Sequence, residues 1–297
     1  MSVITAARYN NLQAKVANIL GNGSGTSGYG QTLESAQVSA DTLIDSQHMA
    51  DLYTDMVAAR VHQVGSVPQS VSTVSAGNII EEDSDDTGTG RGILQYEDLA
   101  DTIETDKDLI YIANTSQSTI TTSKVASTRT ASWGGTVDHV ATVTFASADA
   151  RRHFFNAGGE IRFTADLDPG GSTGKNNDWN NLLSQMGVVK FKSSTTTSDG
   201  SSPGTSFNIG NFDLTSSNQM IFRKDGSGTY SENDYNINAR ELNTTSIEFT
   251  IQFRDDDNNP WDPNVEGTLE SVLGERLPTG SYVALTSPIF ATTNNLA

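Results

Sequence analysis

The spacing of the hydrophobic residues changes part-way along this chain, and the change limits the folds that the chain can adopt. In residues 1–113 three stretches have hydrophobic residues every three or four positions, as on one face of an amphipathic helix, and Gly-rich and acidic loops separate them. From residue 132 onward they alternate with polar residues, which is typical of strands that bury one face. Residues 114–131 are rich in Ser and Thr and follow neither period. The sequence therefore predicts an α+β chain: an N-terminal helical module over 1–113, a linker or extended arm over 114–131, and a mainly antiparallel β-sandwich over 132–297.

The helical module contains three predicted helices. The first covers residues 5–21, the second begins after Ser39 or Asp41 and ends at Gly65, and a third, weaker pattern covers 94–103. Three helices of this length bury little hydrophobic area, so we expect a neighbouring subunit to cover part of their apolar faces. The residues predicted to form this assembly interface are Tyr9, Leu12, Val16, Tyr29, Met49, Leu52 and Met56.

The β region is predicted from alternation at several places. The clearest strand covers residues 247–253, and two others cover 137–145 and 161–167. The passage 151–163 contains a short helical run that ends at a Gly-Gly turn and continues as the second of these alternating strands. Further strands are expected at 188–192, 207–214, 219–224, 234–240 and 281–290, and a short helix at 176–186.

The charge of the chain disfavours nucleic acid and anionic membranes as partners. The sequence has 36 acidic and 18 basic residues, a net charge of -18. Because attraction to phosphate dominates nucleic-acid affinity, this charge disfavours nucleic acid, and it also opposes anionic membrane surfaces. No run approaches the about 20 apolar residues that span a bilayer, and the N-terminus lacks the basic and apolar regions of a secretory signal. We therefore expect no membrane insertion and a protein that stays in the compartment where it is made.

Two glycine-rich segments match known loop motifs only in part. Residues 23–28 spell G-x-G-x-x-G, but a helix precedes them where the dinucleotide motif requires a strand, so we predict a flexible or partner-contacting loop with Tyr29 docked against other residues. Residues 170–175, GGSTGK, fail two of the four fixed positions of a phosphate-binding loop. The same residues contain G-x-S-x-G around Ser172, but the hydrolase order requires a histidine after the serine and all four histidines precede it.

No catalytic residue is predicted. Glu160 and Glu248 are the candidates considered for a glycosidase-like pair, and Glu160 is better explained as a partner of Arg162 or another arginine. The histidines are interpreted as structural, because His48 and His62 lie too far apart along one helix to share a metal ion. The chain has no Cys, which removes disulfides and thiolate metal sites.

One acidic segment matches the spacing of a calcium-binding loop. Asp255, Asp257, Asn259 and Glu266 stand at positions 1, 3, 5 and 12 of that spacing. Pro260 stands at position 6, where the loop needs glycine, and a strand precedes the segment instead of a helix. Two interpretations remain open: the four residues bind calcium, or the segment is an acidic hairpin tip held by its prolines. No other cofactor is predicted.

Two passages resemble a known protein family. They are SWGGTVDHVATVTFASADARRHFFNAGGEIRFTADL, residues 132–167, and ITAARYNNLQAKVANILGNGSGTSGYGQTLESAQVS, residues 4–39, with the later VHQVG. Both are similar to uncharacterised virion structural proteins of tailed bacteriophages, notably those that infect marine bacteria and cyanobacteria. The resemblance implies a non-enzymatic component of the tail, neck, baseplate, fibre or capsid surface, made in the host cytoplasm and located in the virion. Its partners would be other virion proteins and copies of itself.

A second class of function is also open, that of a receptor-binding or glycan-binding fibre or decoration module. In such a module Trp133, Trp179 and Trp261 would stack on the faces of host-surface sugars. In a structural subunit the same three side chains would belong to the core.

Overall fold

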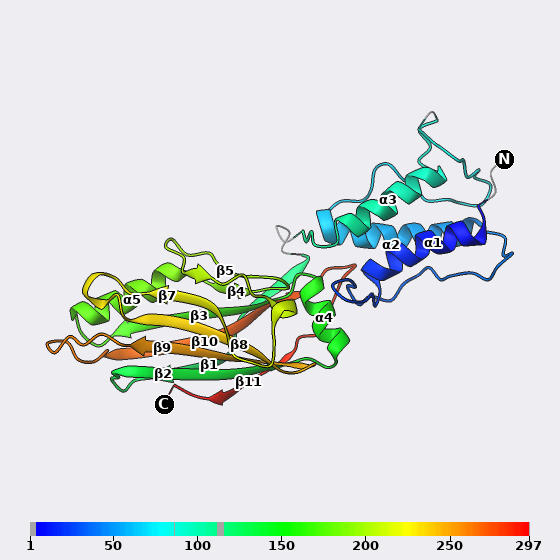
Figure 1. Cartoon of the computed structure of the whole chain (residues 1–297). Helices are drawn as coiled ribbons and strands as arrows, with labels where there is room; N and C mark the ends of the chain where they lie inside the picture. Colours follow the sequence, from blue (N-terminus) through cyan, green and yellow to red (C-terminus); the bar gives the residue numbers. More distant parts are fainter. Residues whose placement is uncertain (1–3, 86, 112–115, 297) are drawn as a thin grey trace. The chain divides into compact units, whose positions relative to one another are not determined.

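The computed structural model describes residues 4–85, 87–111 and 116–296, and the chain forms two compact units (Figure 1). The helical unit takes its described residues from 1–119, 152–158 and 278–285, and the β unit takes them from 120–151, 159–277 and 286–297. The predicted α+β class with an antiparallel β-sandwich is confirmed. The predicted domain boundary is incomplete, because the helical unit also contains two segments from later in the chain.

The helical unit is built on three helices, α1 (Ala6–Leu20), α2 (Ser46–Val64) and α3 (Ile93–Thr105). Thr5 caps α1 through its side-chain oxygen, and Gly65 ends α2 in the left-handed conformation at φ 78°, both as predicted. Helix α2 begins later than predicted, because the side chain of Asp45 accepts the N–H groups of Gln47 and His48. Among the helices in the described ranges, none is long and apolar enough to cross a membrane.

Loops complete a core that the three helices alone do not close. Tyr29 and Ile44 from the loop before α2, and Val71 and Val74 from the loop before α3, are buried among the helical side chains. Val283, from the last segment of the unit, joins the same core. This burial corrects the predicted assembly interface, because the loops supply the covering area that we assigned to a neighbouring subunit. The seven predicted residues are at most 2% exposed within the chain itself: Tyr9, Leu12, Val16, Tyr29, Met49, Leu52 and Met56.

The β unit contains two antiparallel sheets. The five-stranded sheet has the order β1 (Ser118–Arg129), β10 (Gly267–Pro278), β3 (Glu160–Pro169), β4 (Val189–Phe191) and β5 (Thr196–Ser198). The six-stranded sheet has the order β11 (Ile289–Asn294), β2 (Gly135–Thr144), β9 (Ser246–Asp255), β8 (Asp234–Asn243), β7 (Gln219–Asp225) and β6 (Thr205–Ser206). The β unit also contains helix α5 (Gly174–Met186) and two short 3-10 helices, η1 (Asn211–Asp213) and η2 (Gly228–Tyr230). Helix α4 (Ala148–Asn156) belongs to the β unit up to Arg151 and to the helical unit from Arg152 onward.

Aromatic side chains fill the space between the sheets. The ring of Phe249 on β9 has its centroid 5.1 Å from that of Phe163 on β3 and 5.3 Å from that of Phe191 on β4. The two sheets therefore pack face to face through these rings. Along β9 the residues from Phe249 to Asp255 alternate between buried and partly exposed, as the period of two predicts. Helix α5 follows β3 along the chain and packs against it.

Three predictions for the β region were wrong. Residues 118–129 of the predicted linker form the edge strand β1, while residues 114 and 115 lie outside the described residues. Ser and Thr occupy both faces of β1, so it shows no hydrophobic alternation. The strands expected at 207–214 and 281–290 are mostly absent, because β6 ends at Ser206 and β11 begins at Ile289.

Strand β10 was missing from the sequence prediction altogether. Its buried positions include Ser271 and Glu275 as well as Leu269 and Leu273. A buried face that mixes polar and apolar residues does not produce the alternation by which strands are recognised. Antiparallel backbone pairing with β3, which begins with Gly267 opposite Pro169, makes this segment a strand.

The passage 151–163 folds as predicted, with α4, a glycine turn and then β3. Gly158 in this turn has φ 88°, a conformation that residues other than glycine rarely adopt. A Cβ atom at this position would lie 2.7 Å from Cγ2 of Ile110, in the same unit. Backbone conformation and close packing therefore both require glycine here.

We expect Gly158→Ala to lower the thermal stability of the helical unit. Alanine would add left-handed backbone strain and a steric overlap with Ile110, together about 1 to 3 kcal/mol. Gly77→Ala is the matched control, because Gly77 has φ 87° and no heavy atom within 4 Å of an added Cβ. Scanning calorimetry should show a clearly larger loss for Gly158→Ala. Equal losses would contradict the role given to Ile110.

Candidate functional site

The first turn of α5 directs a lysine into the interior of the β unit. Thr173 caps the helix by accepting the N–H of Asn176 at 3.2 Å. Lys175 follows in the first turn, and its side chain is 0% exposed. Lysine is almost never fully buried without a charged partner, so this position calls for opposite charges nearby.

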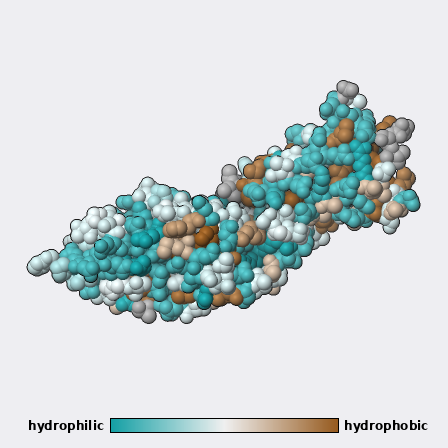
Figure 2. Space-filling view, in the orientation of Figure 1, coloured by the Kyte–Doolittle hydropathy of each residue, from teal (hydrophilic) through white to brown (hydrophobic). Residues whose placement is uncertain are grey.

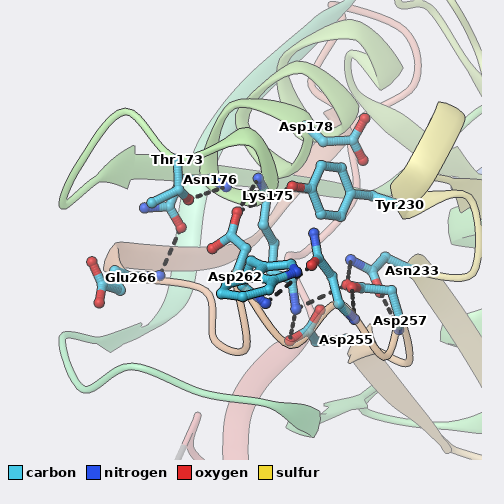
Figure 3. A network of polar contacts seen from close by, with 12 residues as sticks. Thr173, Lys175, Asn176, Asp178, Tyr230, Asn233, Asp255, Asp257, Asp262 and Glu266 are labelled. Carbon is cyan, nitrogen blue, oxygen red and sulfur yellow. Dashed lines mark hydrogen bonds and ion pairs between the residues drawn. The ribbon is translucent and has the colours of Figure 1, made fainter.

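Two aspartates supply those charges. Asp255 is the last residue of β9, and Asp257 lies in the loop that follows. The Nζ atom of Lys175 lies 2.9 Å from Oδ2 of Asp255 and 2.9 Å from Oδ2 of Asp257 (Figure 3). The two aspartate side chains are 1% and 3% exposed. Because the three groups are buried, water and salt screen the interactions between their charges much less than at the surface.

The two carboxyl groups differ in their other partners. Asp257 accepts hydrogen bonds from Nδ2 of Asn233 at 2.9 Å and from the N–H of Asn259 at 2.9 Å. The Oδ1 atom of Asp255 is buried without a hydrogen-bond partner. Hydrogen bonds stabilise a carboxylate in its ionised form, so Asp257 is held ionised more firmly than Asp255.

The pKa values of the cluster follow these contacts. Burial raises the pKa of Asp255 to about 7. Burial also acts against charge on Asp257, but hydrogen bonds from Lys175 and from its other donors outweigh it and hold that pKa below its usual value. Burial likewise opposes the charge on Lys175, and the hydrogen bonds to both aspartates raise its pKa in spite of it. When the site takes up a proton near neutral pH, Asp255 is therefore the group that receives it.

The loop after β9 wraps around the start of α5. Asp262 accepts the N–H of Lys175 at 2.8 Å and the hydroxyl of Tyr230 at 3.1 Å. Glu266 donates its backbone N–H to Oδ1 of Asn176 at 2.8 Å. These contacts hold the N-terminal end of α5 in place, and with it the direction of the Lys175 side chain.

Aromatic rings form the apolar side of the cluster. Trp179, in the helical turn after Lys175, has its ring centroid 6.2 Å from that of Phe253 on β9 and 5.9 Å from that of Trp133. The ring of Tyr235 on β8 packs edge-on against that of Phe253, with the centroids 5.2 Å apart. The charged groups thus lie beside a packed apolar layer in which the effective dielectric constant is low.

The structure brings together two of the four calcium candidates. Asp255 and Asp257 share the ammonium group of Lys175, which occupies the position that a cation between them would take. Asn259 accepts the N–H of Trp261 instead, and the carboxylate of Glu266 points away from both aspartates (Figure 3). No group of three or more acidic or histidine side chains that could hold a metal ion is found in residues 4–85, 87–111 and 116–296. Calcium binding here stays a prediction that would require displacement of the lysine.

The glycine-rich loop at 23–28 has a structural role. Gly23 and Gly28 have φ values of 58° and 103°, and an added Cβ would lie 2.4 Å or less from a backbone oxygen at each. Tyr29 docks as predicted, with its ring centroid 4.8 Å from that of His62 and its hydroxyl bonded to a backbone carbonyl. The glycines therefore shape a tight return of the chain along α1.

The histidines and the two glutamates considered for catalysis also have local partners. His62 is hydrogen-bonded to a backbone carbonyl and His139 to two hydroxyls, and burial lowers the pKa of both to about 4. Both rings are therefore neutral at neutral pH. Glu160 is paired with Arg162 as predicted, and Glu248 is paired with Arg240.

The three tryptophans fall into two groups. Trp133 and Trp179 are 4% and 0% exposed and belong to the core of the β unit. Trp261 is 93% exposed, in the loop after β9. Of the three side chains considered for sugar stacking, only Trp261 is accessible to a ligand.

Comparisons of the chain with protein-family models, with curated proteins and with solved structures gave no match.

We expect Asp262→Ala to destabilise the β unit by about 1 to 3 kcal/mol, because it removes the acceptor of a buried hydrogen bond from Lys175 and a partly buried one from Tyr230. Asp256→Ala is the matched control in the same loop, where the half-exposed pair with Arg254 contributes at most about 1 kcal/mol. Asp262→Asn should recover part of the loss, since its amide oxygen still accepts. Chemical denaturation monitored by tryptophan fluorescence measures all three. A loss for Asp262→Ala no larger than that of the control would refute the proposed cap.

Proposed function

We propose that this chain is a non-enzymatic structural protein of a tailed-phage virion that joins the tail, neck or particle surface through its helical unit. The similarity of residues 4–39 and 132–167 to virion structural proteins supports the assignment. Other virion proteins and further copies of the chain are its proposed partners. No cofactor is required for this role.

The observation that carries the non-enzymatic part of the proposal is the burial of the Lys175 cluster. Lysine and paired carboxylates are residues that enzymes use for proton transfer and nucleophilic attack. Here the three side chains are at most 3% exposed, so an external substrate has no access to them. Their position supports a role within the chain rather than turnover of a substrate.

The surface of the helical unit suggests where a neighbour binds. A groove of about 400 Å³ is lined by Ile4, Ala40 and Leu43, and a second of about 370 Å³ is lined by Ile4, Ile44 and Ile79. Leu43 is 76% exposed and Ile79 is 63% exposed. Figure 2 shows hydrophobic atoms at the surface of this unit, near the end where α1 begins. We call Leu43, Ile79 and these two grooves the apolar end. We propose the apolar end as the assembly surface, in place of the seven interface residues predicted from the sequence, which are buried.

A second candidate function, glycan binding, is favoured by Trp261 alone. Its ring is 93% exposed at the loop after β9, and aromatic rings in such positions stack on sugar faces. This activity is compatible with a virion location, since a particle protein can also contact the host surface.

The assembly proposal is tested by producing particles in cells that express either the wild-type chain or a variant. Quantitative mass spectrometry of the washed particles then measures how many copies of the chain each particle contains. The wild-type chain should be present at a fixed copy number. Leu43→Asp combined with Ile79→Asp should reduce its incorporation about tenfold or more, because burying two carboxylates at an apolar contact is strongly unfavourable. Val67→Asp combined with Leu109→Asp is the control, at residues that are 42% and 50% exposed on the same unit and lie outside both grooves.

Absence of the wild-type chain from washed particles would overturn the proposed function. Equal losses for the two double variants, with unchanged circular dichroism, would overturn the choice of the apolar end. Surface variants are preferable to deletion of α1 and α2, because those helices supply most of the core of the helical unit.

Glycan binding has a separate readout. Trp261→Ala particles should contain normal amounts of the chain but adsorb less to host cells, because the stacking surface is lost. Tyr282→Ala, which removes a ring that is 41% exposed in the helical unit, is the control. Unchanged adsorption of Trp261→Ala particles would contradict a sugar-binding role for this ring.

A further inference from the structure

We propose that Lys175 and Asp255 become joined by an intramolecular isopeptide bond after the chain folds, with Asp257 as the group that transfers the proton. The inference concerns a covalent modification within the β unit. It does not depend on whether the chain is a virion component.

The geometry meets the first requirement, contact between the reacting groups. The amine nitrogen of Lys175 lies at hydrogen-bond distance, 2.9 Å, from one oxygen of each carboxyl group. Helix α5 fixes the lysine and the end of β9 fixes Asp255, so the two groups are held together by the fold. Holding reactants in this way replaces an encounter in solution by an effectively unimolecular step.

The two aspartates are suited to different roles. Amide formation needs a protonated carboxyl group as electrophile and an ionised one as base. Asp257 is held ionised by hydrogen bonds from Asn233 and Asn259. Asp255 lacks such donors, has one oxygen without a partner, and is the carboxyl whose pKa burial raises. Asp255 is therefore the electrophile and Asp257 the base.

The proposed reaction balances without an added reagent. Asp257 takes a proton from the ammonium group of Lys175, and the free amine attacks Cγ of the protonated Asp255 carboxyl. A C–N bond forms, and a C–O bond then breaks as Asp257 passes this proton to the departing hydroxyl group. The attacking nitrogen gives up its second proton to Asp257, which is left protonated and uncharged. One water molecule leaves, and one positive and one negative charge disappear together. No group is oxidised or reduced.

The surroundings favour the amide over the ions. In water an amine and a carboxylic acid remain separate largely because hydration stabilises both ions. At this site the ions are out of contact with water and lie beside the rings of Trp179 and Phe253. Condensation removes both buried charges, which are costly to hold away from water. The same burial then protects the bond from hydrolysis.

The bond would link two elements that are distant in the sequence. Lys175 and Asp255 lie 80 positions apart, one at the start of α5 and the other at the end of β9. The intervening chain includes β4, β5, β6, β7 and β8. A covalent link between its ends would keep this segment as a closed loop in the unfolded chain, which reduces the entropy gained on unfolding.

Intact-mass spectrometry of the full-length chain under denaturing conditions tests the proposal. The wild-type mass should be lower than the sequence mass by one water molecule. Lys175→Met and Asp257→Asn should each show the full sequence mass, because the first lacks the amine and the second lacks the base. Lys190→Met is the matched control, since Lys190 pairs with Asp199 at 2.6 Å but both are partly exposed, and this variant should still lack one water.

Peptide mapping identifies the bond directly. A protease digest of the wild-type chain should contain a branched peptide that joins the segment around residue 175 to the segment around residue 255. A wild-type mass equal to the sequence mass after prolonged incubation would overturn the proposal. Water loss that persists in Lys175→Met would also overturn it, because cyclisation of an Asp-Gly sequence such as Asp225-Gly226 gives the same mass change. If Lys175→Met does not fold, the wild-type digest and Asp257→Asn still decide the outcome.

Discussion

Because hydrophobic residues make up only 35% of this chain, its interior includes polar side chains that must find partners as the protein folds. Glu160 at the start of β3 is buried and pairs with Arg276, the residue directly opposite it on β10. His139 on β2 is buried between hydroxyl groups of Ser271 and Thr292 on two other strands. A shift of one residue in any of these strands would leave a buried polar group without its partner. Polar pairing therefore helps to select the strand register that the aromatic core alone would leave less well defined.

The parts of the fold that were predictable from sequence are those with a strong local signal. Three examples are the start of α1 at Thr5, the end of α2 at Gly65 and the strand predicted from the alternation in 247–253. Each signal depends only on residues close by in the sequence, and each predicted element is present. Strand β1 was not predictable in this way, because an edge strand of Ser and Thr is held by backbone pairing with β10 and buries little side-chain area. Strand β10 was hidden for the opposite reason, since its buried face carries polar residues whose partners are distant.

The candidate site shows the same division. The acidic spacing around Asp255 and Asp257 was visible in the sequence and left two interpretations open, a calcium site or an acidic hairpin tip. The GGSTGK segment that contains Lys175 was also visible, but as an incomplete phosphate loop. The two segments are connected by the side-chain contact of Lys175 with Asp255, and no local sequence pattern records that contact. The sequence thus singled out both segments separately, with calcium as one of two interpretations of the acidic one, whereas the fold places a lysine between the two aspartates.

The helical unit is assembled from three stretches of chain, and this has a consequence for the order of events during synthesis. Ala157 and Val283 are 1% and 0% exposed and belong to its core, although its helices end at Thr105. Because translation proceeds from the N-terminus, the three helices leave the ribosome long before the residues that close their core. The nascent helices must remain incompletely packed while the intervening strands are translated. A chaperone or the ribosome surface would therefore meet this region as an open intermediate, and its final closure requires translation of the segment that carries Val283.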